Sequence, residues 1–444
     1  MTTLIAAPVD AAAELVTTPR LMLSPRAITR SYRALRAALG DVTLYYAVKA
    51  NPHPAVLAAI AEAGGCFDVA SPAETGAALA TGADASRLLS SNPMQSRPAI
   101  RHHHAAGIDT FVVDSLDEAH KVAAEAPGAT LLARLATSGA GSDWSLAGKF
   151  GADPAEVFAI LDLAPQLGLQ AAGVAFHVGS QQREPERWIA PIDTAAGIFT
   201  ALREHGHRPW LLDLGGGFPA SHAVPCPPLA VYGRTIEAAV QAAFGAHRPR
   251  LIAEPGRALV GDAGVLEASV LGVAHRAGRR WVYLDAGIFN GLTETLGEAI
   301  HYRLRTSATG APAAAVLAGP TCDSADVMYR CVDLPDDLAE GDRVWFAAAG
   351  VYTTSYASAF NGFAPLRTEL TDTLPCVGCS RPTPWPAPRW RCPGRRCWPP
   401  SGRPRTTPRC SASPVRPGSR RACCCRRFWA ASATGSDGFA PCAW

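Results

Sequence analysis

Lys49 is the residue whose type and position first suggest chemistry. It is one of only three lysines in 444 residues, and it follows a β-branched and aromatic run, 42–48, that should form a buried strand. We expect desolvation at the end of that strand to lower the pKa of the lysine amine, which would make the amine a usable nucleophile. A single lysine just past a strand is more often a surface residue, so its interpretation depends on what the other strands carry.

A run of glycines could hold an anion. The segment 211–214 leads into residues 215–217, all glycine, whose backbone N–H groups can approach a phosphate with no side chain in the way. Gly256 and Arg257 close the next apolar run. A glycine run alone is also a common flexible turn, but two such features on consecutive strands predict a phosphate site.

A nucleophilic lysine beside a phosphate site suggests pyridoxal 5′-phosphate (PLP) bound covalently to the lysine amine. Glu254 is the candidate carboxylate for the pyridine nitrogen, which it would keep protonated. His177, on the sixth predicted strand, could stack on the ring face, and Ser180 could offer its hydroxyl to the phosphate. Each also has a plain structural interpretation, because Glu254 could simply pair with Arg257 and a strand histidine is more often a satisfied core residue.

Eight short apolar runs would position these residues. They alternate with Ala- and Leu-rich stretches of helical spacing, which indicates a parallel sheet covered on both faces. Polar residues or glycines lie at the end of nearly every run. This favours a (β/α)8 TIM barrel, in which catalytic residues gather at the C-terminal ends of the strands, over an open doubly wound sheet. The predicted strands are 42–48, 66–71, 87–92, 110–115, 130–135, 173–180, 211–217 and 251–257.

The chain is expected to divide into four segments. Residues 1–24 form a lead-in with a strand at 20–23, and residues 25–262 form the PLP-binding barrel. Residues 263–373 form an antiparallel β domain that carries substrate and partner-subunit site residues and is completed by the strand of the lead-in. Residues 374–444 form a tail. Strands of the β domain are expected at 265–273, 280–284, 314–317 and 342–347.

The tail differs in composition from the rest of the chain. It carries 13 arginines, no lysine and one acid, a balance of +12 that leaves −9 for residues 1–373 of a chain whose net charge is +3. It also holds 9 of the 13 cysteines. A GC-rich gene read out of frame yields this mixture, so we interpret the tail as frame-shifted and disordered. The alternatives are a nucleic-acid arm, a zinc module or acylated cysteines.

The composition is otherwise that of a globular, cytoplasmic protein. Hydrophobic residues make up 48% of the chain, enough to bury a large core. No apolar run approaches the roughly 20 residues that span a bilayer, and the N-terminus lacks a signal-peptide pattern. We predict no membrane, no nucleic-acid partner and no bound metal. The three consecutive histidines at 102–104 are interpreted as solvated helix residues.

Seven motifs, in co-linear order over roughly residues 20–370, resemble those of the fold-type III PLP-dependent decarboxylases, and within them most closely the ornithine decarboxylases. The chain departs from the family pattern at Val351, where alanine is usual, and in the tail, which the family lacks. The motifs are YAVKANP at 46–52, FDVAS at 67–71, FHVGS at 176–180, DLGGGFP at 213–219, EPGR at 254–257, GPTCD at 319–323 and FNGF at 360–363.

The resemblance implies a role for each candidate residue. Lys49 would bind the cofactor covalently, Glu254 would pair with its pyridinium and His177 would stack on its ring. Cys322 would protonate the substrate carbon after CO2 leaves, and Asp323 would bind the distal amine of the substrate. In the family the last two reach the site from a partner subunit, which implies a homodimer with active sites at its interface. The other cofactor-binding candidates are Asp68, Glu74, Arg134, Ser180, Gly215, Gly216, Gly217, Gly256, Arg257 and Tyr352, and the other substrate-binding candidates are Phe289, Glu298 and Phe360.

Acidic residues favour a substrate that ends in an ammonium group. Diaminopimelate decarboxylases share the barrel motifs, but they carry an Arg-Pro pair after an Asp-Ala-Gly turn, and here 285–287 is followed by no arginine until Arg303. Glu298 and Asp323 offer negative charge instead, so ornithine, giving putrescine for polyamine biosynthesis, is predicted first and lysine second. The alternatives are a diaminopimelate or arginine decarboxylase, an amino-acid racemase, and a non-catalytic homologue that regulates true decarboxylases by binding.

Overall fold

The computed structural model describes residues 17–375 and residue 377. The predictions for the first 16 residues and for nearly all of the tail, 374–444, lie outside the described residues. Among the described helices, none combines the length and the apolar character that crossing a bilayer requires.

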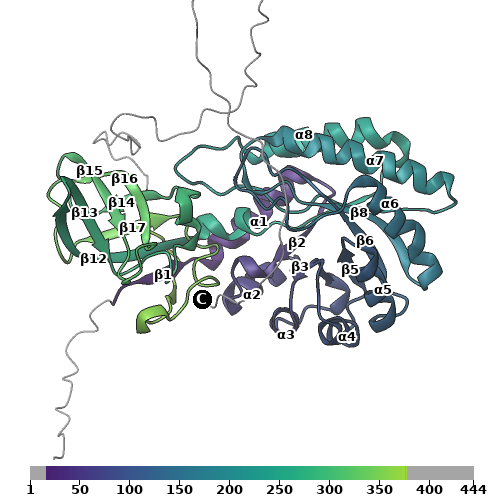
Figure 1. Cartoon of the computed structure of the whole chain (residues 1–444), viewed down its shortest axis with the longest axis horizontal. Coiled ribbons are helices and arrows are strands. Elements are labelled where there is room, and N and C mark those ends of the chain that lie inside the picture. The colour runs from purple at the N-terminus through teal and green to yellow at the C-terminus, as the bar shows by residue number, and fades with distance from the viewer. Residues whose placement is uncertain (1–16, 376, 378–444) are drawn as a thin grey trace, which may run out of the picture. The chain divides into compact units, whose positions relative to one another are not determined.

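Eight parallel strands close into a barrel, and each overlaps one of the eight predicted runs (Figure 1). The ring closes where the last strand pairs with the first, through Ile252↔Thr43 and Ala253↔Leu44. The predicted TIM barrel is therefore confirmed. In chain order its strands are β2 (Thr43–Ala47), β3 (Cys66–Val69), β4 (Leu88–Ser90), β5 (Thr110–Val113), β6 (Thr130–Leu135), β8 (Gln170–Phe176), β10 (Leu211–Asp213) and β11 (Arg250–Ala253).

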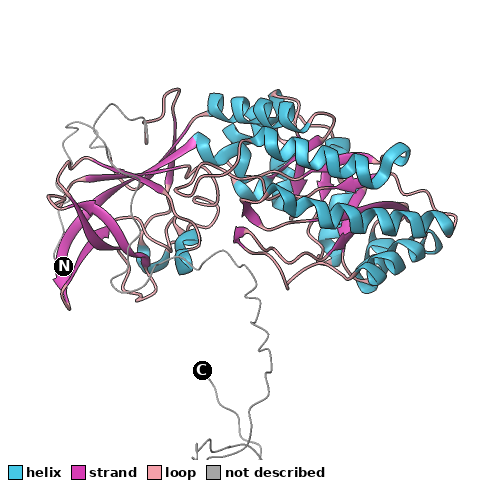
Figure 2. Cartoon of the chain, turned by 90° about the horizontal axis from the view of Figure 1, so that it is seen from above, coloured by secondary structure: helices cyan, strands magenta, loops and turns pink. Residues whose placement is uncertain are grey.

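Helices surround the barrel strands (Figure 2), and most of them begin with a polar cap followed by proline or an acid. Ser71, for example, accepts a hydrogen bond from the backbone N–H of Glu74, so that α3 begins at Pro72 only three residues after β3 ends at Val69. Such short connections keep the residues at the strand ends at the barrel mouth. The helices are α1 (Pro25–Leu39), α2 (Pro54–Glu62), α3 (Pro72–Leu79), α4 (Arg97–Ala105), α5 (Leu116–Glu125), α6 (Pro154–Leu163), α7 (Ile189–Glu204), α8 (Leu229–Phe244) and α9 (Arg257–Val260).

The interior of the barrel is packed and is not a pore. All eight strands contribute to one cluster of side chains, which fills the space between them as in other barrels of this size. Polar side chains are therefore displaced to the mouth. The buried members of the cluster are Tyr45, Leu89, Val112, Leu132, Ala172, Ala175, Leu211 and Ile252, with Cys66 packed against them.

The loops that follow β6 and β8 pair with each other outside the barrel. β7 (Ser142–Trp144) and β9 (Ser180–Gln182) form a two-stranded antiparallel ribbon. The predicted run 173–180 is therefore divided, because β8 ends at Phe176 and Ser180 begins β9. His177 consequently lies in the loop between them and not on a strand as predicted.

The second sheet has eight strands and mixed directions. Its main path is β14-β17-β12-β13-β15-β16, and β1 (Arg20–Leu23) joins it by antiparallel pairing with β12, as expected for the strand of the lead-in. The prediction of an antiparallel domain holds for most pairs, but β13 pairs with β15, and β1 with β18, in parallel. The strands are β12 (Gly264–Arg276), β13 (Arg279–Leu284), β14 (Arg303–Thr306), β15 (Pro312–Ala318), β16 (Val327–Pro335), β17 (Arg343–Ala347) and β18 (Arg367–Leu370).

His103 is buried, so the interpretation of all three histidines at 102–104 as solvated is wrong. Its Nδ1 lies 2.8 Å from Oγ1 of Thr75, which connects α4 to α3. Burial lowers the pKa of His103 to about 4, and the ring is therefore neutral. Its part in the protein is helix packing.

Candidate active site

Lys49 lies in η1 (Val48–Ala50), the single turn that follows β2. Its Nζ donates a hydrogen bond of 2.8 Å to Oδ2 of Asp68, which stands near the end of the neighbouring strand β3. The Asp68 side chain is fully buried, whereas 46% of the Lys49 side chain is exposed. Ser91 completes the arrangement, because its hydroxyl donates to the other oxygen of Asp68. The lysine amine is thus held by a fixed carboxylate and remains accessible.

The pKa of Lys49 is raised, so the expectation of a lowered pKa is wrong. Burial lowers the pKa, but the carboxylates of Asp68 and Glu254 stabilise the ammonium and outweigh the burial. Without a cofactor the side chain is therefore a cation. Its amine can act as a nucleophile only after giving up a proton.

His177 is a neutral imidazole beside Lys49. Burial, together with the positive charges of Arg134 and Lys49, lowers the pKa of His177 to about 3. The backbone N–H of Gly179 donates to Nδ1 at 3.0 Å, which leaves the ring proton on Nε2. A neutral ring can lie against an aromatic cofactor without adding a charge to the site.

The three glycines after β10 form a cradle with no room for side chains. A Cβ atom at Gly216 would lie 2.8 Å from Nε2 of His177 and 2.8 Å from the carbonyl oxygen of Glu254. Gly217 has a φ of +106°, and its Cβ would lie 2.6 Å from the carbonyl oxygen of Gly179. Gly216 is therefore required because there is no space for a side chain. Gly217 is required for the same reason and also because of its positive φ.

Arg257 brings a buried positive charge to the same region. Its Nη2 and Nε donate to the hydroxyl of Ser180 at 3.1 and 3.2 Å, and its guanidinium lies 5.2 Å from the centre of the Tyr352 ring. Tyr352 adopts a φ of 53°, a strained conformation for a residue other than glycine, and its N–H donates to the carbonyl oxygen of Ala50. The hydrogen bond to Ala50 stabilises this conformation, in which the aromatic ring lies next to the arginine.

Arg257 also forms a buried ion pair with Glu294, whose side chain is only 3% exposed. Glu294 belongs to η7 (Thr293–Glu298), in the part of the chain that follows β13, so this pair links the barrel to the second sheet. His222 contacts the same guanidinium through Nε2, at 3.3 Å from Nη1. The sequence patterns predict no role for either residue. A buried acid paired with a distant arginine leaves no local sequence signal.

Glu254 follows β11 and is surrounded by charge. Burial and the carboxylate of Asp68 raise its pKa. The positive charges of Lys49 and Arg134 lower it, and so does the neighbouring carboxyl group of Asp213, but the net shift is upward. The structure therefore brings together Lys49, Asp68, Arg134 and Glu254 as one electrostatic group. Glu74 adjoins it, since its carboxylate accepts the N–H of Ala70 at 2.7 Å and its pKa is raised by burial and by Asp68.

The predicted substrate residues other than Glu298 form a second group, together with Cys322, on the loops of the second sheet. The rings of Phe289 and Phe360 lie 4.9 Å apart, and the N–H of Cys322 donates to Oδ1 of Asn361 at 3.1 Å. Cys322 and Asp323 are exposed. Among the contacts of the described residues, none joins this group to Lys49 of the same chain.

Glu298 is engaged elsewhere. Its Oε1 accepts the backbone N–H of Arg330 at 2.7 Å, and it has a φ of 58°. The structure places it near β16 and shows no contact with Asp323 among the described residues. Its role in binding substrate stays a prediction.

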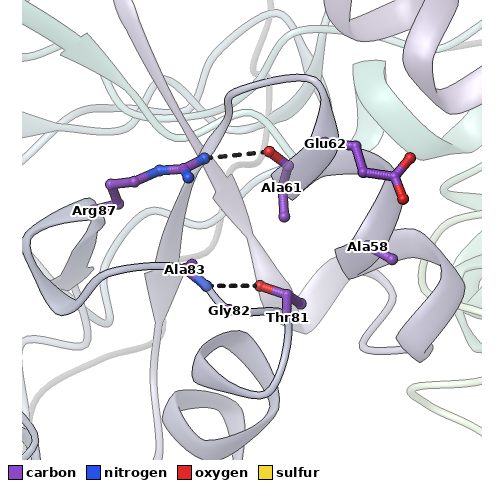
Figure 3. A pocket seen from close by; sticks show the side chains of 7 residues that line it. All are labelled: Ala58, Ala61, Glu62, Thr81, Gly82, Ala83 and Arg87. Carbon is purple, nitrogen blue, oxygen red and sulfur yellow. Dashed lines mark hydrogen bonds between the residues drawn. The ribbon is translucent and has the colours of Figure 1, made fainter.

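A hollow on the outer helices is a separate feature (Figure 3). Arg87 lies across it and donates to the carbonyl oxygens of Ala61 and Gly65. None of its lining residues is a candidate site residue, so we assign it no part in the chemistry. The lining residues are Ala58, Ala61, Glu62, Thr81, Gly82, Ala83 and Arg87.

Comparison with known proteins identifies relatives that cover nearly all of the described chain. The family model "Pyridoxal-dependent decarboxylase, pyridoxal binding domain" matches residues 25–261. Lysine/ornithine decarboxylase of Selenomonas ruminantium is 32% identical over 370 residues, covering 82% of this chain and 92% of that protein. Ornithine decarboxylase of Schizosaccharomyces pombe is 33% identical over 358 residues, covering 77% and 81%. The crystal structure of lysine/ornithine decarboxylase from Vibrio vulnificus, complexed with putrescine, matches with a TM-score of 0.73 and 33% identity over 81% of this chain and 96% of that chain.

Proposed function

The chain belongs to the pyridoxal-dependent decarboxylase family, and on this premise we propose that it converts L-ornithine to putrescine, with L-lysine as its second substrate. The protein is a PLP-dependent lyase that decarboxylates a basic amino acid. The observation that carries the proposal is the Lys49 amine, held at 2.8 Å by Asp68 at the end of a barrel strand.

The barrel mouth fits the cofactor. A phosphate would meet the backbone of Gly216, Gly217 and Gly256, the hydroxyl of Ser180 and the guanidinium of Arg257, where added Cβ atoms at the glycines would clash with existing atoms. Lys49 would supply the covalent link, and Glu254 would face the ring nitrogen. The set therefore contains hydrogen-bond donors for a phosphate dianion, an amine for the covalent link and a carboxylate for the ring nitrogen. Each of these groups is compatible with PLP.

Five residues of the candidate site are proposed to have separate tasks in the reaction. PLP, when bound, supplies the electron sink that takes up the electron pair left by CO2. Asp68 fixes the position of Nζ of Lys49, and the neutral His177 offers an uncharged face to the ring. Glu254 would keep a negative charge beside the ring nitrogen. Sγ of Cys322 holds the proton that is delivered to the substrate carbon.

Asp323 is proposed to select the substrate by binding its distal ammonium group. One oxygen of Asp323, Oδ1, accepts the N–H of Ala325 at 2.8 Å and so fixes the carboxylate in its loop. The other has no donor among the described residues. The relatives named as lysine/ornithine decarboxylases support this class of substrate, and the Vibrio vulnificus enzyme was crystallised with a diamine.

Asp323→Asn should raise KM for ornithine by at least about 30-fold, because an amide cannot form an ion pair with a desolvated ammonium. The asparagine keeps the hydrogen bond to Ala325, so the loop is preserved. Steady-state kinetics would show the change in KM with kcat much less affected. Asp117→Asn, at an exposed position of α5, is the matched control. An unchanged KM in Asp323→Asn would remove Asp323 from the substrate site.

A homodimer is proposed because the two groups of site residues do not meet within one chain. Lys49 lies at the barrel mouth, whereas the exposed Cys322 and Asp323 lie on the second sheet. A partner subunit would bring them together and exclude water from the site.

With ornithine far below the raised KM of Asp323→Ala, that variant and Lys49→Ala should each show almost no activity alone, and mixing them should restore about a quarter of the wild-type activity after full subunit exchange. Random exchange makes half of the dimers hybrids, and each hybrid has one intact site of two. CO2 release from the mixture, compared with each variant alone, is the measurement. A mixture that stays inactive although mass spectrometry detects the hybrids would show that each chain builds its site alone.

A further inference from the structure

Asp213 is a buried acid that none of the assigned roles uses. It is the last residue of β10, two residues before the first glycine of the cradle, and its side chain is inaccessible to solvent. Oδ1 accepts the backbone N–H of Gly215 at 2.8 Å. Oδ2 is buried and receives no N–H or O–H donor from the described residues. A buried carboxylate oxygen without a donor is costly, so its surroundings require an explanation.

Glu254 is the acid that neighbours Asp213 across the barrel strands. β10 and β11 are neighbours in the barrel, with Asp213 opposite Ile252, and the N–H of Glu254 donates to the carbonyl oxygen of Gly215 at 2.8 Å. Glu254 raises the pKa of Asp213, whereas Asp213 lowers the pKa of Glu254, so the two acids are close enough to affect each other's ionisation. A hydrogen bond between two carboxyl groups needs one proton, because two ionised carboxylates in contact offer only acceptors and repel each other.

The charges around the pair decide which group keeps the proton. Glu254 faces the positive charges of Lys49 and Arg134 as well as the carboxylate of Asp68. The largest effects on the pKa of Asp213, besides burial, come from Glu254, the N–H of Gly215 and the carboxylate of Asp68, and no cation is among them. Burial raises the pKa of both groups, but cations are among the largest effects on the pKa only for Glu254, where Lys49 and Arg134 stabilise the ionised form. The proton therefore belongs on Oδ2 of Asp213.

We propose that Asp213 is a positioning residue: it keeps one proton on Oδ2 and through it donates a hydrogen bond to the carboxylate of Glu254, which holds Glu254 ionised and correctly oriented beside the position of the ring nitrogen of PLP. This inference rests on the proposed cofactor site and adds a residue to it. It also accounts for the buried Oδ2 that otherwise has no partner. Asp213 itself contacts neither substrate nor cofactor in this arrangement.

Infrared spectroscopy on the full chain can locate the proton without any assay of activity. A protonated carboxylic acid has a carbonyl band that ionised carboxylates lack, and labelling with ¹³C-aspartate or ¹³C-glutamate shows which residue type carries it. We expect a band in the wild type minus Asp213→Asn difference spectrum that shifts with ¹³C-aspartate only. A band that shifts with ¹³C-glutamate, or no band in the difference spectrum, would overturn the proposal.

Two substitutions test the positioning role. Asparagine at 213 can accept from Gly215 with its oxygen and donate to Glu254 with its nitrogen, so Asp213→Asn should keep kcat and the dissociation constant of PLP within about threefold of wild type. Asp213→Leu cannot donate and should lower kcat by about 10- to 100-fold with a much smaller change in KM. Equal losses in both variants would mean that the negative charge of Asp213 is what matters, and would contradict the proposal.

The readouts separate this inference from the proposed function. Binding of PLP to the apoprotein, measured by fluorescence titration, and the infrared band can both be recorded if ornithine proves not to be the substrate. If Asp213→Leu fails to fold, the asparagine variant and the labelled spectra still decide where the proton lies. If the wild type shows the aspartate band but does not turn over ornithine, ornithine is not the substrate, and the proposed protonation of Asp213 still stands.

Discussion

Replacing Lys49 by alanine is expected to lower kcat/KM for ornithine by on the order of 10⁴-fold or more, because the amine that attaches the cofactor is lost. Asp68, which holds that amine at 2.8 Å, would then face the site with its charge unpaired. CO2 release measures the loss. Reduction with borohydride followed by peptide mass spectrometry should find the cofactor on the peptide that contains Lys49 in the wild type and on no peptide of the variant.

The chain offers a matched control for this experiment. Lys149 is exposed, and its ammonium lies over the ring of Phe150, 4.9 Å from the centre, so Lys149→Ala removes the same charge from the surface. We expect that variant to retain wild-type kinetics. Activity that persists in Lys49→Ala, or cofactor attached at Lys149, would show that the barrel mouth has been assigned to the wrong lysine.

Glu254→Gln should lower kcat by about 10²- to 10³-fold and change KM for ornithine much less, because the neutral amide cannot keep the ring nitrogen of the cofactor protonated. The substitution preserves shape, so cofactor binding through the phosphate cradle should persist. Stopped-flow and steady-state kinetics would separate the chemical step from binding. Glu62→Gln, at an exposed position of α2, is the control. A Glu254→Gln variant with normal kcat would place the ring nitrogen elsewhere.

Most of the barrel could be predicted from the sequence because its strands are buried on both faces. Such strands read as continuous apolar runs, and each run ends where polar residues reach the mouth. The second sheet gave weaker signals. β14 (Arg303–Thr306) and β18 (Arg367–Leu370) are short and contain charged residues. β18 joins the sheet by pairing with β1, which is far away in the sequence. No local pattern carries that information.

The positions of the site residues were easier to predict than their electrostatics. Lys49, His177 and Arg257 all lie near the ends of barrel strands, where the motifs placed them. The raised pKa of Lys49 was missed because it depends on the carboxylate of Asp68, which the fold brings within 2.8 Å. The ion pair between Arg257 and Glu294 was missed for the same reason. Charge pairs between distant segments are properties of the fold.

The most direct test of the central claim is CO2 release from the purified protein with added PLP, offered ornithine, lysine, arginine and diaminopimelate separately. The proposed site predicts turnover of ornithine, slower turnover of lysine, and none of either by Lys49→Ala. Release from diaminopimelate alone would contradict the acidic substrate pocket at Asp323. No release from any of the four amino acids, although PLP is bound at Lys49, would contradict decarboxylation of a basic amino acid.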